Sequence, residues 1–299
     1  MKSRGFTLVE LLAVLVLISV IAIIAVPSII NYINQSEGEI DEATKKLVFS
    51  GVELYVNQNK NDFRAPLKQY CVTLQEIVDQ KYLSDSIFDS VSGSKIDSNT
   101  FVKVINYYNV NKERYDFKYD ISNECTEKEY VCIPATEQTV TVGNVPEGNY
   151  EAGDEYICQV SNNEAHSFFV LKKENGDNLK LIMNKNLEGK VKWCKSGDNV
   201  SCEADAVKEH LTNKTAEWTR LNQSQIILPD AVDLVSSNAP EWMKVNLVEQ
   251  YTGYWTSTPS GSYRAKFMSQ SGLLSDLHTD EEYDGVRPAI IINISEIVD

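Results

Sequence analysis

The feature that most constrains this chain is a run of apolar residues close to its N-terminus. Residues 11–26 are sixteen positions interrupted only by Ser19. Extending the run to residues 6–30 adds one charge, Glu10, and one helix breaker, Pro27. A helix needs about 20 apolar residues to cross the hydrocarbon core of a bilayer. The rest of the sequence is polar, so we expect residues 6–30 to be the single transmembrane helix.

The flanks of this run predict its orientation, and Glu10 predicts a function for it. Lys2 and Arg4 precede the span and an acidic cluster over residues 37–42 follows it. The positive-inside rule therefore places the N-terminus in the cytoplasm and the bulk of the chain outside. A carboxylate within a membrane helix costs about 2.5–3.5 kcal/mol on insertion scales, and such a cost usually marks function.

Residues 4–10, with the sequence RGFTLVE, resemble the prepilin signature of type IV pilins and type II secretion pseudopilins. The resemblance implies that prepilin peptidase removes a leader of residues 1–5 by cutting after Gly5 and methylates the new terminal amine of Phe6. It also implies that Glu10 pairs with the Phe6 amine of a neighbouring subunit during filament assembly. Pro27 matches a proline that family members often carry.

Physical chemistry agrees with this resemblance. Cleavage after Gly5 leaves a positive amine at the membrane edge, with Glu10 one helical turn deeper. Pairing between neighbouring subunits offsets two desolvation costs that neither charge could offset alone. The alternative is a plain signal anchor in which the glutamate is accidental.

The helix is predicted to continue beyond the membrane, as one kinked helix over residues 6–59. Apolar residues recur there at spacings near three and four, which is typical of an amphipathic helix packed on a globular head. These residues are Ile33, Ile40, Ala43, Leu47, Val48, Leu54 and Tyr55. We interpret the stripe as core packing and assign it no functional site.

Residues 31–134 are predicted to form a pilin-like head of α+β class, with the long helix against a small antiparallel sheet. Thr73 and Glu76 have the spacing of a capping box, which predicts a short helix to Tyr82. Residues 101–108 and 114–119 are rich in β-formers and predict a hairpin. Its tyrosines are interpreted as sheet packing rather than an adhesive surface: Tyr107, Tyr108, Tyr115 and Tyr119.

A linker over residues 135–149 is predicted to lead to a second extracellular domain of mixed α+β class over residues 150–299. Its clearest signal is an Asn-Gly step between residues 167–173 and 178–184, which predicts a β-hairpin. The other expected elements are a helix from Ser201 to Leu211, a short helix opened by Leu228-Pro229-Asp230, and strands over 254–257, 263–269 and 286–292. Pro288 makes the last strand an edge, or irregular at its start.

Three segments of this second domain resemble a bacterial extracellular domain related to C-type-lectin-like and formylglycine-generating-enzyme-like folds. They read YWTST at 254–258, RAKF at 264–267 and GVRPA at 285–289. The chain departs from both relatives. It has neither the Glu-Pro-Asn or Gln-Pro-Asp triplet that binds calcium and sugar in C-type lectins nor the paired reactive cysteines of the oxidase branch.

Three groups of residues in this domain have a structural and a ligand-binding interpretation. Arg287 is expected to tie loops together, the alternative being an anion site. Four tryptophans are expected in the core, the alternative being a sugar-stacking platform: Trp193, Trp218, Trp242 and Trp255. An acidic run is expected in a solvated loop, the alternative being a calcium site: Asp276, Asp280, Glu281, Glu282 and Asp284.

Six cysteines outside the cytoplasm are expected to form disulfides. Spacing favours three pairs: Cys71–Cys125, Cys132–Cys158 and Cys194–Cys202. Cys125 with Cys132 remains the main competitor. Zinc held by Cys194, Cys202 and His210 is a further alternative, although eight-residue spacings suit zinc poorly.

Composition narrows the function further. The net charge of −15 argues against a nucleic-acid-binding protein. Three scattered histidines argue against a histidine metalloenzyme, so we expect no cofactor, no metal and no enzymatic activity. The favoured hypothesis is a minor or tip-located type IV pilin with a binding or adhesion domain for an unknown surface ligand. The alternatives are a structural pseudopilin of a secretion or competence machine and, less favoured, a membrane-tethered surface enzyme.

Overall fold

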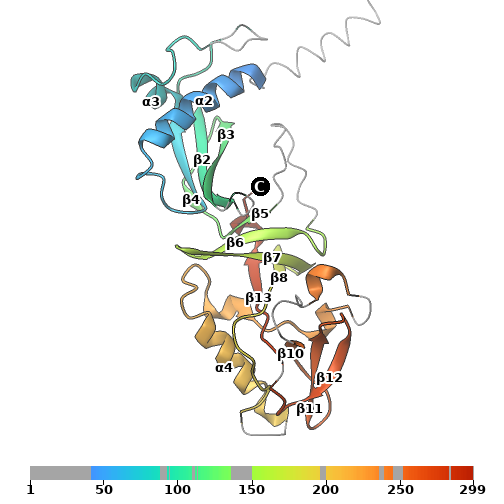
Figure 1. The fold of residues 1–299 in the computed structure, drawn as a ribbon. Helices are drawn as coiled ribbons and strands as arrows, with labels where there is room; N and C mark the ends of the chain where they lie inside the picture. Colours follow the sequence, from blue (N-terminus) through green and yellow to red (C-terminus); the bar gives the residue numbers. More distant parts are fainter. Residues whose placement is uncertain are drawn as a thin grey trace, which may run out of the picture. The chain divides into compact units, whose positions relative to one another are not determined.

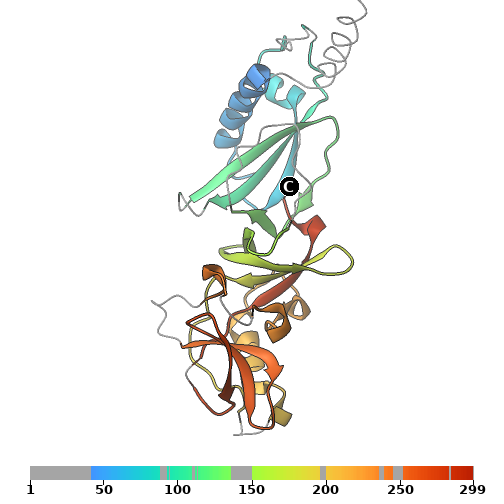
Figure 2. The same cartoon turned by 90° about the vertical axis from the view of Figure 1, so that its right-hand side faces the viewer.

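The computed structural model describes residues 42–87, 93, 95–109, 112, 114–135, 150–195, 200–235, 239–244, 252–282 and 284–298 (Figures 1 and 2). The predicted membrane helix over residues 6–30 lies outside this part of the chain, as does all but the first residue of the predicted linker. The chain divides into two compact units. One comprises Met1–Asn59, Val72–Val102 and Ile121–Glu124, and the other Lys60–Cys71, Lys103–Asp120 and Cys125–Asp299.

The described residues of the first unit include the helices α2 (Glu42–Gln58) and α3 (Leu74–Asp79). The sequence correctly predicts the start of α3, where the Thr73 side chain accepts a hydrogen bond from the Glu76 amide and so satisfies a free helix donor. The segment that follows α3 lies close to α2 at Gly51, where an added Cβ would overlap the Leu83 side chain. Glycine at this position therefore serves close packing.

The buried face of α2 differs from the predicted stripe. Leu47 and Leu54 are more than half exposed, so assigning them to the core was wrong. The face that is buried still follows a spacing of three and four, and it consists of Thr44, Lys45, Val48, Gly51, Val52 and Val56. The small and β-branched residues face inward here, and the two leucines are exposed to solvent.

A four-stranded sheet has the order β3-β2-β1-β4. Its strands are β1 (Lys68–Thr73), β2 (Phe101–Asn109), β3 (Arg114–Ser122) and β4 (Lys128–Glu129). The predicted strands over 101–108 and 114–119 are confirmed as β2 and β3, which lie side by side. β3 forms one edge of the sheet, and none of its nine residues is buried.

A six-stranded antiparallel sheet has the order β5-β6-β7-β8-β13-β9. Its strands are β5 (Cys132–Pro134), β6 (Glu155–Ser161), β7 (Glu164–Lys173), β8 (Asn178–Met183), β9 (Ile226–Ile227) and β13 (Ala289–Asn293). The predicted Asn-Gly hairpin is confirmed as β7 and β8. Its turn requires positive φ angles, +74° at Gly176 and +57° at Asp177, which glycine and aspartate adopt more readily than most residues.

The last strand differs in part from its prediction. β13 begins after Pro288 and lies between β8 and β9, so it is not an edge strand. Pro288 has no amide proton, but its carbonyl accepts a hydrogen bond from the Met183 amide at 2.8 Å. The proline therefore stands just outside the ladder, where a missing donor costs nothing.

A three-stranded sheet has the order β10-β11-β12, comprising Gly253–Pro259, Arg264–Ser269 and Leu274–His278. The sequence predicted the first two strands and missed β12. A core cluster covers one face of β8 with Leu179 and Leu181, and it also contains Trp255 of β10. A second cluster covers the other face and joins Ile182 of β8 to Met268 of β11.

Helix α4 (Asp205–Lys214) begins later than predicted. Its N-cap is Ala204, held in a left-handed conformation, and not Ser201, which belongs to the 3-10 turn η1 (Val200–Cys202). The helix packs on the core through Val207 and Leu211. The predicted helix after Pro229 is a single 3-10 turn, η3 (Ala231–Asp233). Similar turns are η2 (Gln223–Gln225), η4 (Glu241–Met243) and η6 (Ile294–Glu296).

Candidate functional site

The predicted processing and assembly residues, Gly5, Phe6 and Glu10, lie outside the described residues. Their roles therefore remain predictions from the sequence. Within the described part of the chain, which begins at residue 42, no helix is long and apolar enough to cross a membrane.

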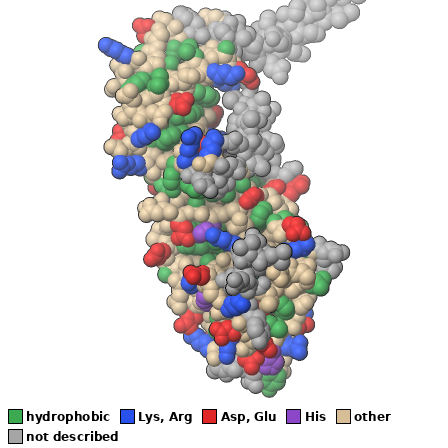
Figure 3. All heavy atoms as spheres, viewed as in Figure 1, with side chains coloured by type: hydrophobic (Ala, Val, Ile, Leu, Met, Phe, Trp, Pro, Cys, Tyr) green, Lys and Arg blue, Asp and Glu red, His purple; other side chains and the backbone are tan. Residues whose placement is uncertain are grey.

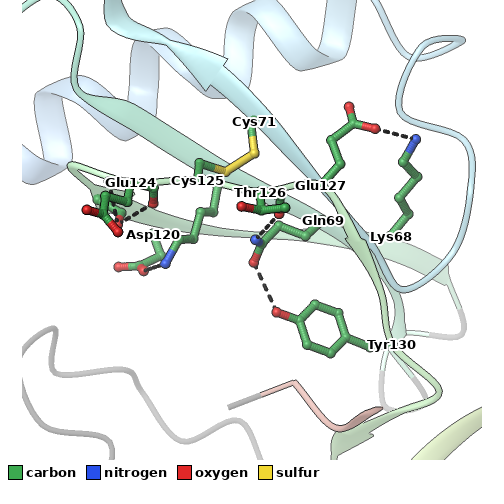
Figure 4. Close-up of a disulfide and its surroundings, with 11 residues drawn as sticks. Lys68, Gln69, Cys71, Asp120, Glu124, Cys125, Thr126, Glu127 and Tyr130 are labelled. Carbon is green, nitrogen blue, oxygen red and sulfur yellow. Dashed lines mark hydrogen bonds and ion pairs between the residues drawn. A yellow bond between two sulfur atoms is a disulfide. The ribbon is translucent and has the colours of Figure 1, made fainter. Parts of the chain in front are cut away.

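All six cysteines form disulfides, in the pairing that the sequence favours. Cys71 of β1 bonds to Cys125, with 5.7 Å between the Cα atoms (Figure 4). Nearby, the Lys68 ammonium lies 2.8 Å from the Glu127 carboxylate. The bond and the ion pair together hold the segment before β4 against β1.

The Cys132–Cys158 bond joins β5 to β6, where the two residues lie directly opposite each other in the ladder. Both side chains are fully buried. The two residues are 26 positions apart, so the bond encloses the whole segment predicted as a linker. β5, which precedes that segment, and β6, which follows it, therefore belong to one sheet.

The Cys194–Cys202 bond rules against the zinc alternative. The two sulfurs are bonded to each other and so are not thiolates, the form that binds zinc. The only cluster of metal-binding residue types in the described part of the chain contains these two cysteines and Asp205, and it does not include His210.

Arg287 is fully buried and holds loops together, as the structural interpretation predicts. One guanidinium nitrogen, Nη1, donates to the carbonyls of Trp242 and Met243 at 3.1 and 3.2 Å. The other, Nη2, donates to the carbonyls of Asn184 and Lys244 at 3.0 and 2.9 Å. Four backbone carbonyls therefore accept from the two Nη groups, and burial keeps the guanidinium away from an anion in solvent.

Tyr254 completes this arrangement. Its ring centre lies 4.7 Å from the Arg287 guanidinium carbon, a cation–π contact, and its hydroxyl donates to the Met243 carbonyl at 3.0 Å. Burial raises the pKa of Tyr254 to about 12. The phenol is therefore neutral at physiological pH and acts as a hydrogen-bond donor.

The tryptophans are core residues rather than a sugar-stacking platform. Trp193, Trp218 and Trp255 are each at most 2% exposed. The indole N–H of Trp193 donates to the Thr256 carbonyl at 2.9 Å, and that of Trp255 donates to the Val191 carbonyl at 2.8 Å. Trp242 is partly buried and stacks on Phe169, with 5.5 Å between ring centres.

The acidic run does not converge into a calcium site among the described residues. Asp276 pairs with Lys266 at 2.8 Å, and Asp280 contacts His278 at 2.5 Å. Asp284 differs from these two aspartates because it is fully buried. On the face that Figure 3 shows, acidic and basic side chains are interspersed.

The Asp284 carboxylate is buried, and its two oxygens differ in their hydrogen bonding. One oxygen accepts from the Thr252 hydroxyl at 2.5 Å, and the other has no hydrogen-bond partner among the described residues. Burial raises the pKa of Asp284 to about 6, although the Thr252 hydroxyl and the charge of Lys190 both act to lower it. A buried carboxylate that is only partly hydrogen-bonded destabilises the fold whenever it is ionised.

An ion network that sequence analysis missed lies at the Asn-Gly hairpin. The Lys180 ammonium lies 2.9 Å from Asp233 and 3.0 Å from Glu174, and Lys172 contacts both acids as well. Burial lowers the pKa of Lys180, but the two acids outweigh this effect and raise it overall. The structure places Lys172 opposite Lys180 in the ladder, where like charges destabilise the pair, and the two acids offset that repulsion.

The N-terminus of the chain matches a known family model. Residues 1–26 match the model described as the prokaryotic N-terminal methylation motif. The match supports a type IV pilin or pseudopilin type of N-terminus, with processing by prepilin peptidase and membrane anchoring before assembly in a surface filament. No curated protein and no solved structure matches the chain. The lectin-like resemblance of residues 150–299 gains no support from these comparisons.

Proposed function

We propose that this chain is a minor or tip-located type IV pilin subunit. It is inserted in the membrane and assembled through its N-terminal helix, and it displays residues 150–299 as a binding or adhesion domain. Its partners are other pilin subunits, prepilin peptidase, the membrane and an unidentified surface ligand. We expect neither enzymatic activity nor nucleic-acid binding.

The observation that carries the proposal is the methylation motif over residues 1–26. The three disulfides agree with an oxidising compartment outside the cytoplasm. A filament subunit needs one small head, whereas this chain adds six-stranded and three-stranded sheets to its four-stranded sheet. That bulk would disturb tight packing along a filament, which favours low copy number or a place at the tip.

The runner-up is a structural pseudopilin of a type II secretion or competence machine, because the same N-terminal motif serves both. Counting subunits in purified filaments separates the two hypotheses. A few copies per filament, imaged at one end, support the tip-located pilin. Copies distributed along the whole filament would refute it.

The assembly role is tested by Glu10→Gln and Glu10→Leu in cells that also make the major subunit. We expect both variants to be cleaved after Gly5 and methylated on Phe6, because neither change touches the scissile bond. Both should be absent from sheared filaments, since the incoming Phe6 amine then lacks a partner in hydrocarbon. Mass spectrometry of the N-terminal peptide and blotting of filaments measure the two effects.

The matched control is Glu37→Gln, which removes an equal charge outside the predicted span. It should enter filaments at the level of the unmodified chain. An intact Met1, or a cut near Ala25, would refute the pilin assignment. Normal incorporation of the Glu10 variants would show that the carboxylate has no assembly role.

A further inference from the structure

Strand β3 has the properties of a surface that pairs with another strand. It forms the edge of its sheet, with β2 as its only strand neighbour among the described residues. It is nine residues long, and none of them is buried. Natural edge strands are usually short, bulged or covered, because an open edge offers unpaired backbone groups to other chains.

The two faces of β3 differ in chemistry. Tyr115, Phe117 and Tyr119 alternate along one face, where Tyr115 is 43% exposed. Its ring contacts Tyr108 of the neighbouring strand edge to face, with 5.3 Å between centres. The aromatic row therefore begins within the sheet and continues to its open edge.

The opposite face carries charges of alternating sign: Arg114, Asp116, Lys118 and Asp120. Neighbours on the same face partly balance them. Asp116 accepts from Arg114 at 3.1 Å, and Asp120 lies 3.6 Å from Lys103 of β2. The alternation matters because a second strand laid along this edge would meet the charges in an order that depends on its direction and register.

We propose that β3 pairs antiparallel with β3 of a second copy of this chain, centred on Phe117. In that register Arg114 faces Asp120 and Asp116 faces Lys118, so all four charged residues meet an opposite charge. On the other face Tyr115 meets Tyr119 and Phe117 meets itself. Opposite charges and aromatic pairs are the cross-strand contacts that stabilise antiparallel sheets.

Competing registers are less favourable. Centring the pair on Lys118 places that lysine opposite itself and Asp116 opposite Asp120. Centring it on Tyr119 keeps only the Lys118–Asp120 contacts between opposite charges. The Phe117 register is also isologous, since the contacts repeat about a two-fold axis, as in most homodimers. This self-complementarity identifies a second copy, rather than an unrelated peptide, as the occupant.

The inference does not depend on the proposed function, because it concerns two copies of the chain whether or not they enter a filament. It is tested with the full chain purified in detergent, so that every variant carries the same N-terminal segment. The first test is oxidative cross-linking of single cysteine variants, with the native disulfides left intact.

Phe117→Cys should form a disulfide-linked dimer on mild oxidation, because the two introduced thiols face each other. Tyr115→Cys is the matched control. Its two thiols would lie four residues apart along the strands, about 13 Å, beyond the reach of a disulfide. A mixture of Tyr115→Cys and Tyr119→Cys should cross-link, because these positions face each other in the proposed register.

The second test uses charge. Asp116→Lys and Lys118→Asp each place two like-charged pairs across the interface and should weaken the dimer by about tenfold in analytical ultracentrifugation. The two variants mixed together should form a heterodimer, because the lysine introduced at position 116 of one chain then faces the aspartate introduced at position 118 of the other. A merely structural role for these residues would not produce this rescue.

Each result decides the question. Cross-linking specific to Phe117→Cys, together with heterodimer rescue, supports the pairing. Equal cross-linking of Phe117→Cys and Tyr115→Cys would overturn the register. A chain that stays monomeric at all concentrations would overturn the pairing itself. Circular dichroism must show that the variants are folded. This outcome includes the case in which another segment of the same chain covers β3.

Discussion

Strands β3 and β8 differ in every aspect of burial. Five of the six residues of β8 are buried, whereas none of the nine in β3 is. β8 has a strand on each side and a core cluster on each face, and β3 has an open edge within the described part of the chain. Burial of apolar area is the main source of stability. The buried residues around β8 therefore contribute more to stability than the partly buried residues of β3.

Charged side chains are buried too, and the effect of each on stability depends on its hydrogen-bond partners. Arg287 has four carbonyl acceptors, whereas one oxygen of Asp284 has no hydrogen-bond partner among the described residues. Removing a buried cation that four carbonyls accept from leaves those acceptors without a donor, and keeping a buried carboxylate with one oxygen that accepts no hydrogen bond is costly when the group is ionised. Arg114 of β3 is exposed, and its removal should be nearly neutral for stability.

The largest effect is expected for Arg287→Ala, which leaves four backbone carbonyls without this donor. The free energy of unfolding should fall by at least about 3 kcal/mol, because a buried acceptor left without its donor costs about 1–3 kcal/mol and four carbonyls lose theirs. Urea denaturation followed by tryptophan fluorescence measures it. Arg114→Ala on β3 is the control and should change stability by less than about 0.5 kcal/mol. Similar losses for both variants would contradict the comparison.

The second effect concerns the disulfides. Cys71–Cys125 has a sequence separation of 54 and Cys194–Cys202 one of 8. By chain entropy, replacing both cysteines with alanine should cost about 4 kcal/mol for the first pair and about 2.5 kcal/mol for the second. Calorimetry of the two double variants tests this order. A larger loss for the short loop would mean that packing, and not loop entropy, decides the effect.

The smallest effect depends on pH. The folded state raises the pKa of Asp284 from 3.8 to about 6, so ionisation of this group lowers stability as pH rises between those values. Asp284→Asn should therefore be more stable than the unmodified chain at pH 7.5, by at most about 3 kcal/mol. The difference should shrink as pH falls and disappear by about pH 3, where the carboxyl is protonated in both the folded and the unfolded state.

Asp276→Asn provides the control for this prediction. The hydrogen bond from Lys266 lowers the pKa of Asp276. Replacing Asp276 should therefore lower the free energy of unfolding at neutral pH instead of raising it, and only slightly, because the carboxylate is exposed. Thermal unfolding across the pH range separates the two variants. A pH-independent difference for Asp284→Asn would show that the buried carboxylate does not titrate as proposed.

Local signals in the sequence predicted local structure well. The Asn-Gly step predicted the β7–β8 hairpin, and the Thr73 capping position predicted the start of α3, because each depends on neighbouring residues alone. Spacing also favoured the disulfide pairs that the structure forms. The sequence also predicted that Arg287 ties loops together and that all four tryptophans lie in the core, where three are buried and Trp242 is partly buried.

Features that depend on distant partners were missed. β5 and β9 have three and two residues, too few for a periodic pattern, and they exist because longer strands pair with them. Leu47 and Leu54 follow a helical stripe, but tertiary packing selects the valine face of α2 instead. At the start of α4, Ser201 has capping chemistry, yet the backbone at Ala204 sets the boundary. The roles of Gly5, Phe6 and Glu10 stay predictions, because these residues lie outside the described part of the chain.

The position of the Cys132–Cys158 bond also has a mechanical consequence. A pulling force between the start of the chain and any point after Cys158 passes through the two sulfur atoms instead of through the residues between them. That stretch of 26 positions, fully extended, would otherwise lengthen the molecule by about 90 Å. Because the disulfide carries the force, the residues between Cys132 and Cys158 are not extended. A load applied after Cys158 therefore reaches the N-terminal part of the chain without first unfolding those residues.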